Sequence, residues 1–160
     1  MCCKVLGIRE LAKPVGKWCP HCDVGKGCKI YDTRPQECQT FHCLWLVDSR
    51  MGDHWKPEHS KIVITTGWNG NSLEFRCDPG QPRAWRKEPY YSEIMQFAVN
   101  ARSFDGAMFV VVNESSTLVA PEGEFPLGKV DPDQRVVQQF QGTRLVNVRL
   151  IHNDDAENPR

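Results

Sequence analysis

The segment from residue 2 to residue 43 reads CCKVLGIRELAKPVGKWCPHCDVGKGCKIYDTRPQECQTFHC and contains seven of the eight cysteines of the chain. Cysteines at this density either form disulfides in a secreted protein or bind metal as thiolates, and the redox compartment decides between the two. Met1 leads directly into the cysteines, without the apolar run and small-residue cleavage site of an export signal. We therefore expect a cytoplasmic protein whose reduced cysteines bind zinc or an iron–sulfur centre.

The spacing of the cysteines predicts a loop that folds back on a metal. Cys19 and Cys22 are separated by two residues, so one tight turn can direct both sulfur atoms at one ion. The loop after them contains Gly25 and Gly27, which can adopt the positive φ of a chain that turns back before Cys28.

A short helix is predicted after Pro35, which suits the first helical position. On this helix Cys38 and His42 share one face. Cys43 would lie about 140° round an ideal helix from Cys38. The helix therefore ends before Cys43, or the two cysteines have different partners.

The predicted metal ligands are the cysteines of this segment, namely Cys2, Cys3, Cys19, Cys22, Cys28, Cys38 and Cys43. A closed zinc site takes four ligands, and the remaining cysteines with His21 or His42 could complete a second site. An iron–sulfur cubane also takes four cysteines, whereas three would leave one iron open to a substrate. The Cys-Pro-His-Cys turn favours zinc, since the ferredoxin pattern of closely spaced cysteines is absent. The remaining alternative is that the cysteines are reduced thiols without metal, or disulfides in a compartment other than the expected one.

Residues 2–46 resemble a known family in the motifs KP-x-G-x-W-C-x-H-C and G-x-GC-x-IY-x-x-RP-x-x-C-x-x-F-x-C-x-W-L, preceded by CC. These motifs are similar to those of the YkgJ-like cysteine-cluster proteins, which are described as zinc- or iron-chelating, without an agreed activity. The resemblance covers a little over a quarter of the chain and implies metal binding rather than a particular reaction.

The resemblance also implies which cysteines correspond to those of the family. The family's most characteristic cysteines correspond to Cys3, Cys28, Cys38 and Cys43, and a subset of members also has Cys19 and Cys22. Many members begin with C-x-x-C-x-x-C-C, whereas this chain begins at the final pair. Two cysteines of that opening are therefore missing, and Cys19 with Cys22 could replace them.

Composition sets limits on the partners. The chain has 160 residues, with 20 basic and 20 acidic side chains, so its overall charge favours neither nucleic acid nor a membrane surface. No apolar run reaches the 18 or so residues of a membrane span. We expect one compact domain with a cysteine module and connecting loop at 1–60, a body at 61–151 and a polar tail at 152–160.

The body shows the patterns of ordinary secondary structure. Three hairpins are predicted, from 62–66 with 73–77, 108–113 with 116–121, and 135–140 with 144–151. An Asn-Gly pair at 69–70 marks the first turn. A helix is predicted at about 89–104, ended by Gly106. This order of elements along the chain, two strands, a helix and four strands, predicts an α+β fold. In it, a metal-bound cysteine-rich module docks on an antiparallel sheet with one main helix.

Single residues outside the cluster are expected to have structural roles. Cys77 is predicted to fill the core, Glu93 to favour the start of the helix, and His54 and His59 to be solvated loop residues. Leu44, Trp45, Leu46 and Trp55 are predicted to anchor the module to the body.

Two classes of function follow from these patterns. The first, which we favour, is a non-catalytic metal-stabilised module that binds a protein partner or senses metal. The second is a redox or metal-dependent enzyme that uses an open coordination site or leftover thiols.

Overall fold

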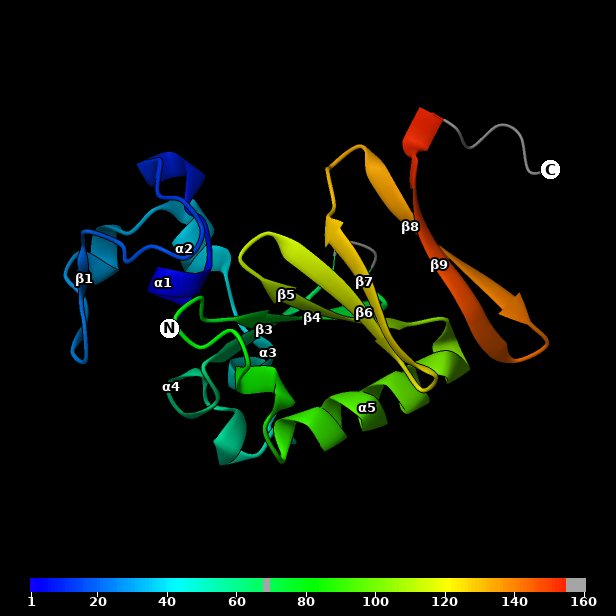
Figure 1. The fold of residues 1–160 in the computed structure, drawn as a ribbon. Helices are drawn as coiled ribbons and strands as arrows, with labels where there is room; N and C mark the ends of the chain where they lie inside the picture. Colours follow the sequence, from blue (N-terminus) through cyan, green and yellow to red (C-terminus); the bar gives the residue numbers. More distant parts are fainter. Residues whose placement is uncertain (68–69, 155–160) are drawn as a thin grey trace.

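The elements of the fold form three groups along the chain (Figure 1). A computed structural model describes residues 1–67 and 70–154. Residues 1–60 form short helices and a small ladder, residues 62–129 form a sheet with a long helix, and residues 134–152 form a separate hairpin. The cysteine-rich segment and the hairpin lie on opposite sides of the sheet in Figure 1.

The N-terminal segment consists of very short elements. They are α1 (Cys2–Val5), β1 (Cys22–Asp23), β2 (Gly27–Cys28), α2 (Gln36–Thr40), α3 (Leu44–Val47) and α4 (Pro57–Ser60). Helices of this length have no independent stability in water, so the segment depends on contacts between its loops. The α2 helix follows Pro35 and ends at Thr40, and Cys43 precedes α3. Of the two alternatives, the one in which the helix ends before Cys43 is confirmed. The prediction that Cys38 and His42 share one face of this helix is wrong, because His42 lies beyond its end.

Single turns of 3-10 helix connect the larger elements throughout the described chain. They are Arg9–Leu11, Tyr31–Thr33, Asp53–Trp55, Ala84–Arg86 and Arg102–Phe104.

Five strands form the central sheet, in the order β3-β4-β5-β6-β7. They are β3 (Ile62–Thr66), β4 (Ser72–Cys77), β5 (Ala107–Val112), β6 (Ser115–Ala120) and β7 (Gly123–Lys129). The first two predicted hairpins are present as the antiparallel pairs β3–β4 and β5–β6. Asn69 of the predicted first turn lies outside the described residues.

The prediction of an antiparallel sheet is wrong for one pair of strands. β4 and β5 run parallel, with Ser72 opposite Ala107. The chain between them contains α5 (Tyr90–Ala101), whose 12 residues span about 18 Å, close to the length of a six-residue strand, about 20 Å. The helix returns the chain to the starting end of β4, and neighbouring strands joined by such a crossover run parallel.

The predicted helix at about 89–104 corresponds to α5 and the 3-10 turn that follows it. After this turn, Asp105 adopts a left-handed conformation with φ of 54°. A Cβ atom on Gly106 would lie 2.6 Å from the carbonyl oxygen of Asn71. Glycine is therefore required where the helix returns to the sheet.

The β7 strand is not predicted by the sequence pattern, because Pro126 and two glycines interrupt its apolar residues. Proline is tolerated here because β7 is an edge strand, and the ladder with β6 is irregular between Ser116 and Thr117.

The third predicted hairpin is present and stands apart from the sheet. β8 (Gln134–Gln141) pairs with β9 (Arg144–His152), and the pair forms a two-stranded sheet of its own. A hairpin of two strands is marginally stable alone. Here Leu145 and Val148 pack with Leu118 and Phe125 on the face of the sheet opposite α5.

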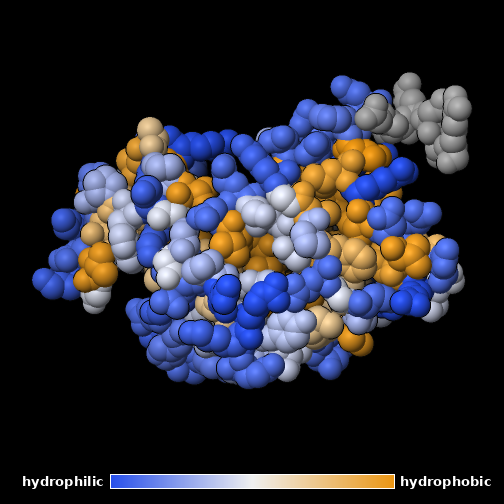
Figure 2. All heavy atoms as spheres, in the orientation of Figure 1, coloured by the Kyte–Doolittle hydropathy of each residue, from blue (hydrophilic) through white to orange (hydrophobic). Residues whose placement is uncertain are grey.

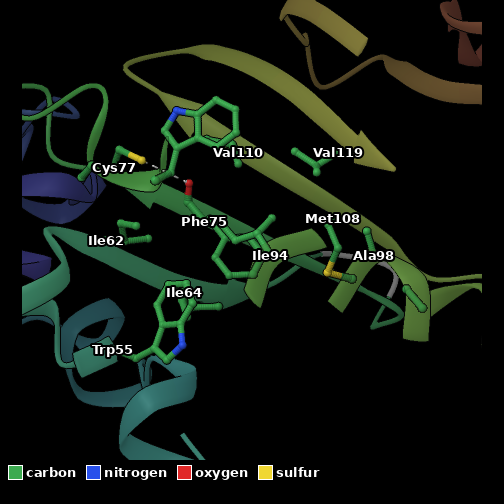
Figure 3. Packing of buried hydrophobic residues seen from close by; sticks show 13 residues of the cluster. Trp55, Ile62, Ile64, Phe75, Cys77, Ile94, Ala98, Met108, Val110 and Val119 are labelled. Carbon is green, nitrogen blue, oxygen red and sulfur yellow. Dashed lines mark hydrogen bonds between the residues drawn. The ribbon is translucent and has the colours of Figure 1, made fainter. Parts of the chain in front are cut away.

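The main core lies between α5 and the sheet (Figure 3). Phe75 and Val110 from the strands meet Ile94 and Ala98 from the helix. Trp55 reaches this core from the connecting loop and is only 1% exposed, which confirms its predicted role as an anchor.

Apolar surface is unevenly distributed on the face shown in Figure 2. Hydrophobic atoms gather where the β8–β9 hairpin meets the sheet, with smaller patches over the cysteine-rich segment. Among the helices of the described chain, none has both the length and the apolar character needed to cross a membrane.

Candidate metal centre

Backbone hydrogen bonds fold the cysteine-rich segment back on itself. The amide of Cys19 donates to the carbonyl of Cys3 at 2.9 Å, and the amide of Cys22 donates to the carbonyl of Cys19 at 3.0 Å. Cys22 and Cys28 are direct partners in the β1–β2 ladder. Cys3 is thus held beside the turn and the ladder that contain Cys19, Cys22 and Cys28.

The glycines of the β1–β2 loop have the backbone conformation expected of them. Gly25 has a φ of 87° and Gly27 a φ of 134°, values that favour glycine. The loop reverses the chain directly before Cys28, as the spacing predicts.

A pocket of about 360 Å³ lies inside the folded segment. Of the predicted ligands, those that line it are Cys2, Cys3, Cys19, Cys28 and Cys38, and both His21 and His42 line it as well. Cys43 instead lines a neighbouring hollow of about 230 Å³, which Cys2 also borders. The tertiary structure therefore brings five of the seven predicted ligands to one pocket, places Cys43 beside it and leaves Cys22 outside its lining.

The donor side chains surround the pocket rather than one point within it. In residues 1–67 and 70–154, no group of three or more histidine, cysteine, aspartate or glutamate side chains is arranged to hold a single metal ion. All eight cysteines are free thiols.

The pKa values of the two neighbouring thiols, Cys2 and Cys3, shift in opposite directions. The Cys3 thiol hydrogen-bonds to Cys2, and this bond, together with the nearby terminal amine, lowers the pKa of Cys2 to about 6 against the opposing effect of burial. The same bond raises the pKa of Cys3, and burial and the neighbouring sulfur atoms of Cys2 and Cys22 raise it further.

Cys38 experiences the same crowding. Burial raises its pKa first, followed by the charges of Cys19 and Cys2. Thiolates formed in this space would repel one another, and the positive charge of a metal cation would offset that repulsion and so favour their deprotonation.

Lys13 is a buried residue of the site that sequence reasoning missed. Its side chain is 5% exposed, and Nζ donates to the carbonyl oxygens of Lys4 and Pro14, each at 3.1 Å, and of Leu6. Burial lowers the pKa of Lys13, while the nearby Cys19 and Cys3 raise it. Lys13 therefore fixes the loop that follows Cys2 and Cys3. The Lys-Pro dipeptide of the motif, Lys13-Pro14, was the one sequence signal that could have indicated this role.

The segment docks on the end of the sheet formed by β3 and β4. Val5 is buried, and Leu44 and Trp45 pack against the main core. These positions confirm two of the predicted anchors. The prediction that Leu46 is also an anchor is wrong, because its side chain is 61% exposed at the rim of the pocket.

Cys77 and the loop histidines lie outside the pocket. Cys77 is 2% exposed in the main core, as expected, and its Sγ donates to the carbonyl of Phe75 at 3.9 Å (Figure 3). His59 is exposed, with Nδ1 3.1 Å from the carbonyl of Asp53.

His54 is not the solvated loop residue that the sequence predicts. Its Nε2 lies 2.9 Å from Oε1 of Glu93, and Glu93 also accepts the indole N–H of Trp55. Glu93 therefore connects the start of α5 to the loop, a role that no local pattern reveals.

No family model, curated protein or solved structure matches the chain. The resemblance to the YkgJ-like proteins rests on the motifs of residues 2–46.

Proposed function

We propose that residues 1–46 form a metal-binding cysteine cluster of the YkgJ-like kind, in which the metal is mainly structural. The observation that carries the proposal is the pocket that five cysteines and two histidines share. Thiolate and imidazole donors suit zinc and iron. Bound metal would neutralise the crowded thiolates of Cys2, Cys3 and Cys38. The pKa values of Cys2 and Cys3 depend on each other, and the charge of Cys2 raises the pKa of Cys38.

The small apolar core of the segment supports a structural role for the metal. Among residues 1–46, the buried apolar side chains are Val5, Ile8 and Cys19. Segments of this size with so little core need metal or disulfides to fold. The free energy of metal binding would then contribute to the folding free energy of this segment.

Zinc is the first candidate and an iron–sulfur centre is the alternative. The Cys19–Cys22 turn, closed by its backbone hydrogen bond, suits a zinc site. One observation favours the alternative, since the cysteines surround a pocket of about 360 Å³ without three donors meeting at one point. A cluster of several atoms needs its cysteines spread around it, whereas zinc needs its ligands at one point.

The rim of the pocket supports partner binding as the role of the module. Tyr31 and Leu46 line the pocket and are each 61% exposed. Exposed apolar side chains around a pocket are a feature of protein interaction sites. A protein partner would cover them, and occupancy of the metal site would control the shape of this surface.

The test is the metal content of protein purified without air, measured by elemental mass spectrometry with acid-labile sulfide and visible absorbance. A colourless protein with near-stoichiometric zinc is expected for the first candidate. A brown protein with iron and sulfide is expected for the alternative. A freshly purified protein that carries neither metal and takes up neither on titration would contradict the proposal.

Cysteine variants show which ligand set applies. Cys28→Ser and Cys38→Ser should lose metal, whereas Cys77→Ser, the control outside the pocket, should keep it and cost about 1–3 kcal/mol of stability. Cys43→Ser should lose metal if the ligands are those that the resemblance implies, and keep it if they are those that line the pocket. Equal metal content in all four variants would exclude thiolate ligation by these cysteines.

A further inference from the structure

The β8–β9 hairpin differs in charge from the rest of the chain. Residues 134–153 contain three arginines, Arg135, Arg144 and Arg149, and none of the 20 acidic residues of the chain. The overall charge of zero is therefore unevenly distributed, and this hairpin is locally cationic.

The ladder places all three arginines on one face. In the β8–β9 register, Arg135 is opposite Ile151, Val137 is opposite Arg149, and Gln141 is opposite Arg144. The alternating residues Val136, Leu145 and Val148 pack against the sheet, so the other face points away from it. The outer face also carries Gln139 opposite Asn147.

The three arginines are exposed and have no ion-pair partner within the part of the chain that the structure describes. Five arginines elsewhere in the described chain are paired with carboxylates, for example Arg86 with Glu124 at 2.6 Å and Arg50 with Asp48 at 2.7 Å. Within the described residues, the outer face of the hairpin therefore offers three guanidinium groups without ion-pair partners, among amide and aliphatic side chains and with no carboxylate between them.

The positions of the arginines along the hairpin suit a polyanion with regularly spaced charges. Side chains on one face of a strand recur about every 6.7 Å, so the rows of Arg135 and Arg144, three steps apart, are separated by about 20 Å. Double-stranded DNA has one negative charge per about 1.7 Å along its axis, so a surface of this length faces several phosphates.

We propose that the outer face of the β8–β9 hairpin binds double-stranded DNA, independently of the proposed metal site. A two-stranded ribbon fits the major groove of B-form DNA. The major groove of A-form RNA is too narrow to admit it. Arginine, glutamine and asparagine are the side chains that hydrogen-bond to guanine and adenine edges in that groove. Single strands are bound mainly by aromatic stacking, and the outer face carries no aromatic side chain. The affinity comes from phosphate contacts, so the binding is weak and depends on salt.

The test is fluorescence anisotropy of a labelled 20-base-pair duplex with the full chain. Three phosphate contacts predict that log K falls with log salt concentration with a slope of about −2.7. Arg135→Gln, Arg144→Gln and Arg149→Gln together should remove this slope, and each single variant should reduce its magnitude by about 0.9. Arg→Lys at all three positions should retain the slope.

The matched control removes the same charge elsewhere. Lys17, Arg83 and Lys87 are exposed and have no ion-pair partner among the described residues, and Gln at all three should leave binding unchanged. The proposal is overturned if the duplex does not bind at about 50 mM salt, or if the control variant loses as much affinity as the hairpin variant. Tighter binding of single strands, of duplex RNA or of polyglutamate than of the DNA duplex would overturn it as well. The single variants of these exposed residues decide the question if the triple variant does not fold.

Discussion

Nζ of Lys4 lies 2.6 Å from Oδ1 of Asp78, and this ion pair joins the cysteine-rich segment to the end of β4. Asp78 is only 6% exposed, and the same Oδ1 accepts the amide of Gly80 at 2.9 Å. Beside this pair, a Cβ atom on Gly16 would lie 2.8 Å from the ring of Pro79. The segment is therefore positioned on the sheet by a shielded charge pair and a close backbone approach.

Asp78→Asn should detach the segment from the sheet. The substitution leaves the Lys4 ammonium without its carboxylate, and we expect the free energy of unfolding to fall by about 1.5–3 kcal/mol. Urea denaturation gives the energy, and limited proteolysis shows whether residues 1–46 are cleaved first. The control is Asp23→Asn, which breaks the exposed pair of Asp23 and Lys26 at 3.4 Å and should cost at most about 1 kcal/mol. Equal effects of the two variants would show that docking does not depend on the ion pair.

Removal of metal should unfold the cysteine-rich segment and leave the sheet intact, if the proposed function is correct. Chelation withdraws the metal, and acidification protonates the thiolates that hold it, so both remove the same stabilisation. We expect protease cleavage within residues 1–46 after either treatment, while the far-UV circular dichroism of the sheet persists. Simultaneous loss of protection across the whole chain would show a single cooperative unit.

Glu93→Ala should destabilise the core through Trp55. The indole N–H of this buried residue would lose its acceptor, and we expect a loss of about 1–3 kcal/mol in the free energy of unfolding. Ser92→Ala changes an exposed residue in the same helical turn and should cost no more than about 0.5 kcal/mol. Glu93→Gln keeps a side-chain acceptor for the indole N–H of Trp55, so its loss of stability should lie between those of Glu93→Ala and Ser92→Ala. A loss as large for Ser92→Ala would mean that helix initiation, rather than the Trp55 contact, is the role of this turn.

Cys77 should make the protein less stable at alkaline pH. Burial raises the pKa of this thiol from 9.0 to about 12. Below pH 9.0 the thiol is protonated in both states, so its contribution to stability is constant. Between pH 9.0 and about 12 it ionises only when unfolded, and the free energy of unfolding falls by about 1.4 kcal/mol per pH unit.

The comparison of wild type with Cys77→Ala isolates this effect, because all other titrating groups are shared. Urea denaturation from about pH 8 to about pH 11 should show a steeper decline for the wild type, starting from the higher stability of the filled core. Parallel curves would mean that water reaches the Cys77 thiol.

The sequence alone predicted what depends on neighbouring residues. The Cys19–Cys22 turn, the glycines before Cys28, the end of the α2 helix and the three hairpins follow from turn geometry and short-range periodicity. The helix α5 and the core position of Cys77 follow from the same kind of signal. The motif of residues 2–46 also selected the segment in which the candidate site lies.

Only the tertiary structure decided what depends on segments that meet from far apart. The α5 crossover makes β4 and β5 parallel, Cys43 lies beside the pocket rather than in it, and Lys13 and Glu93 acquire buried partners. Strand direction is determined by how the helix packs across the sheet, and a polar side chain gains its partners from the elements that bury it. These interactions are made between residues distant in sequence, so no local pattern encodes them.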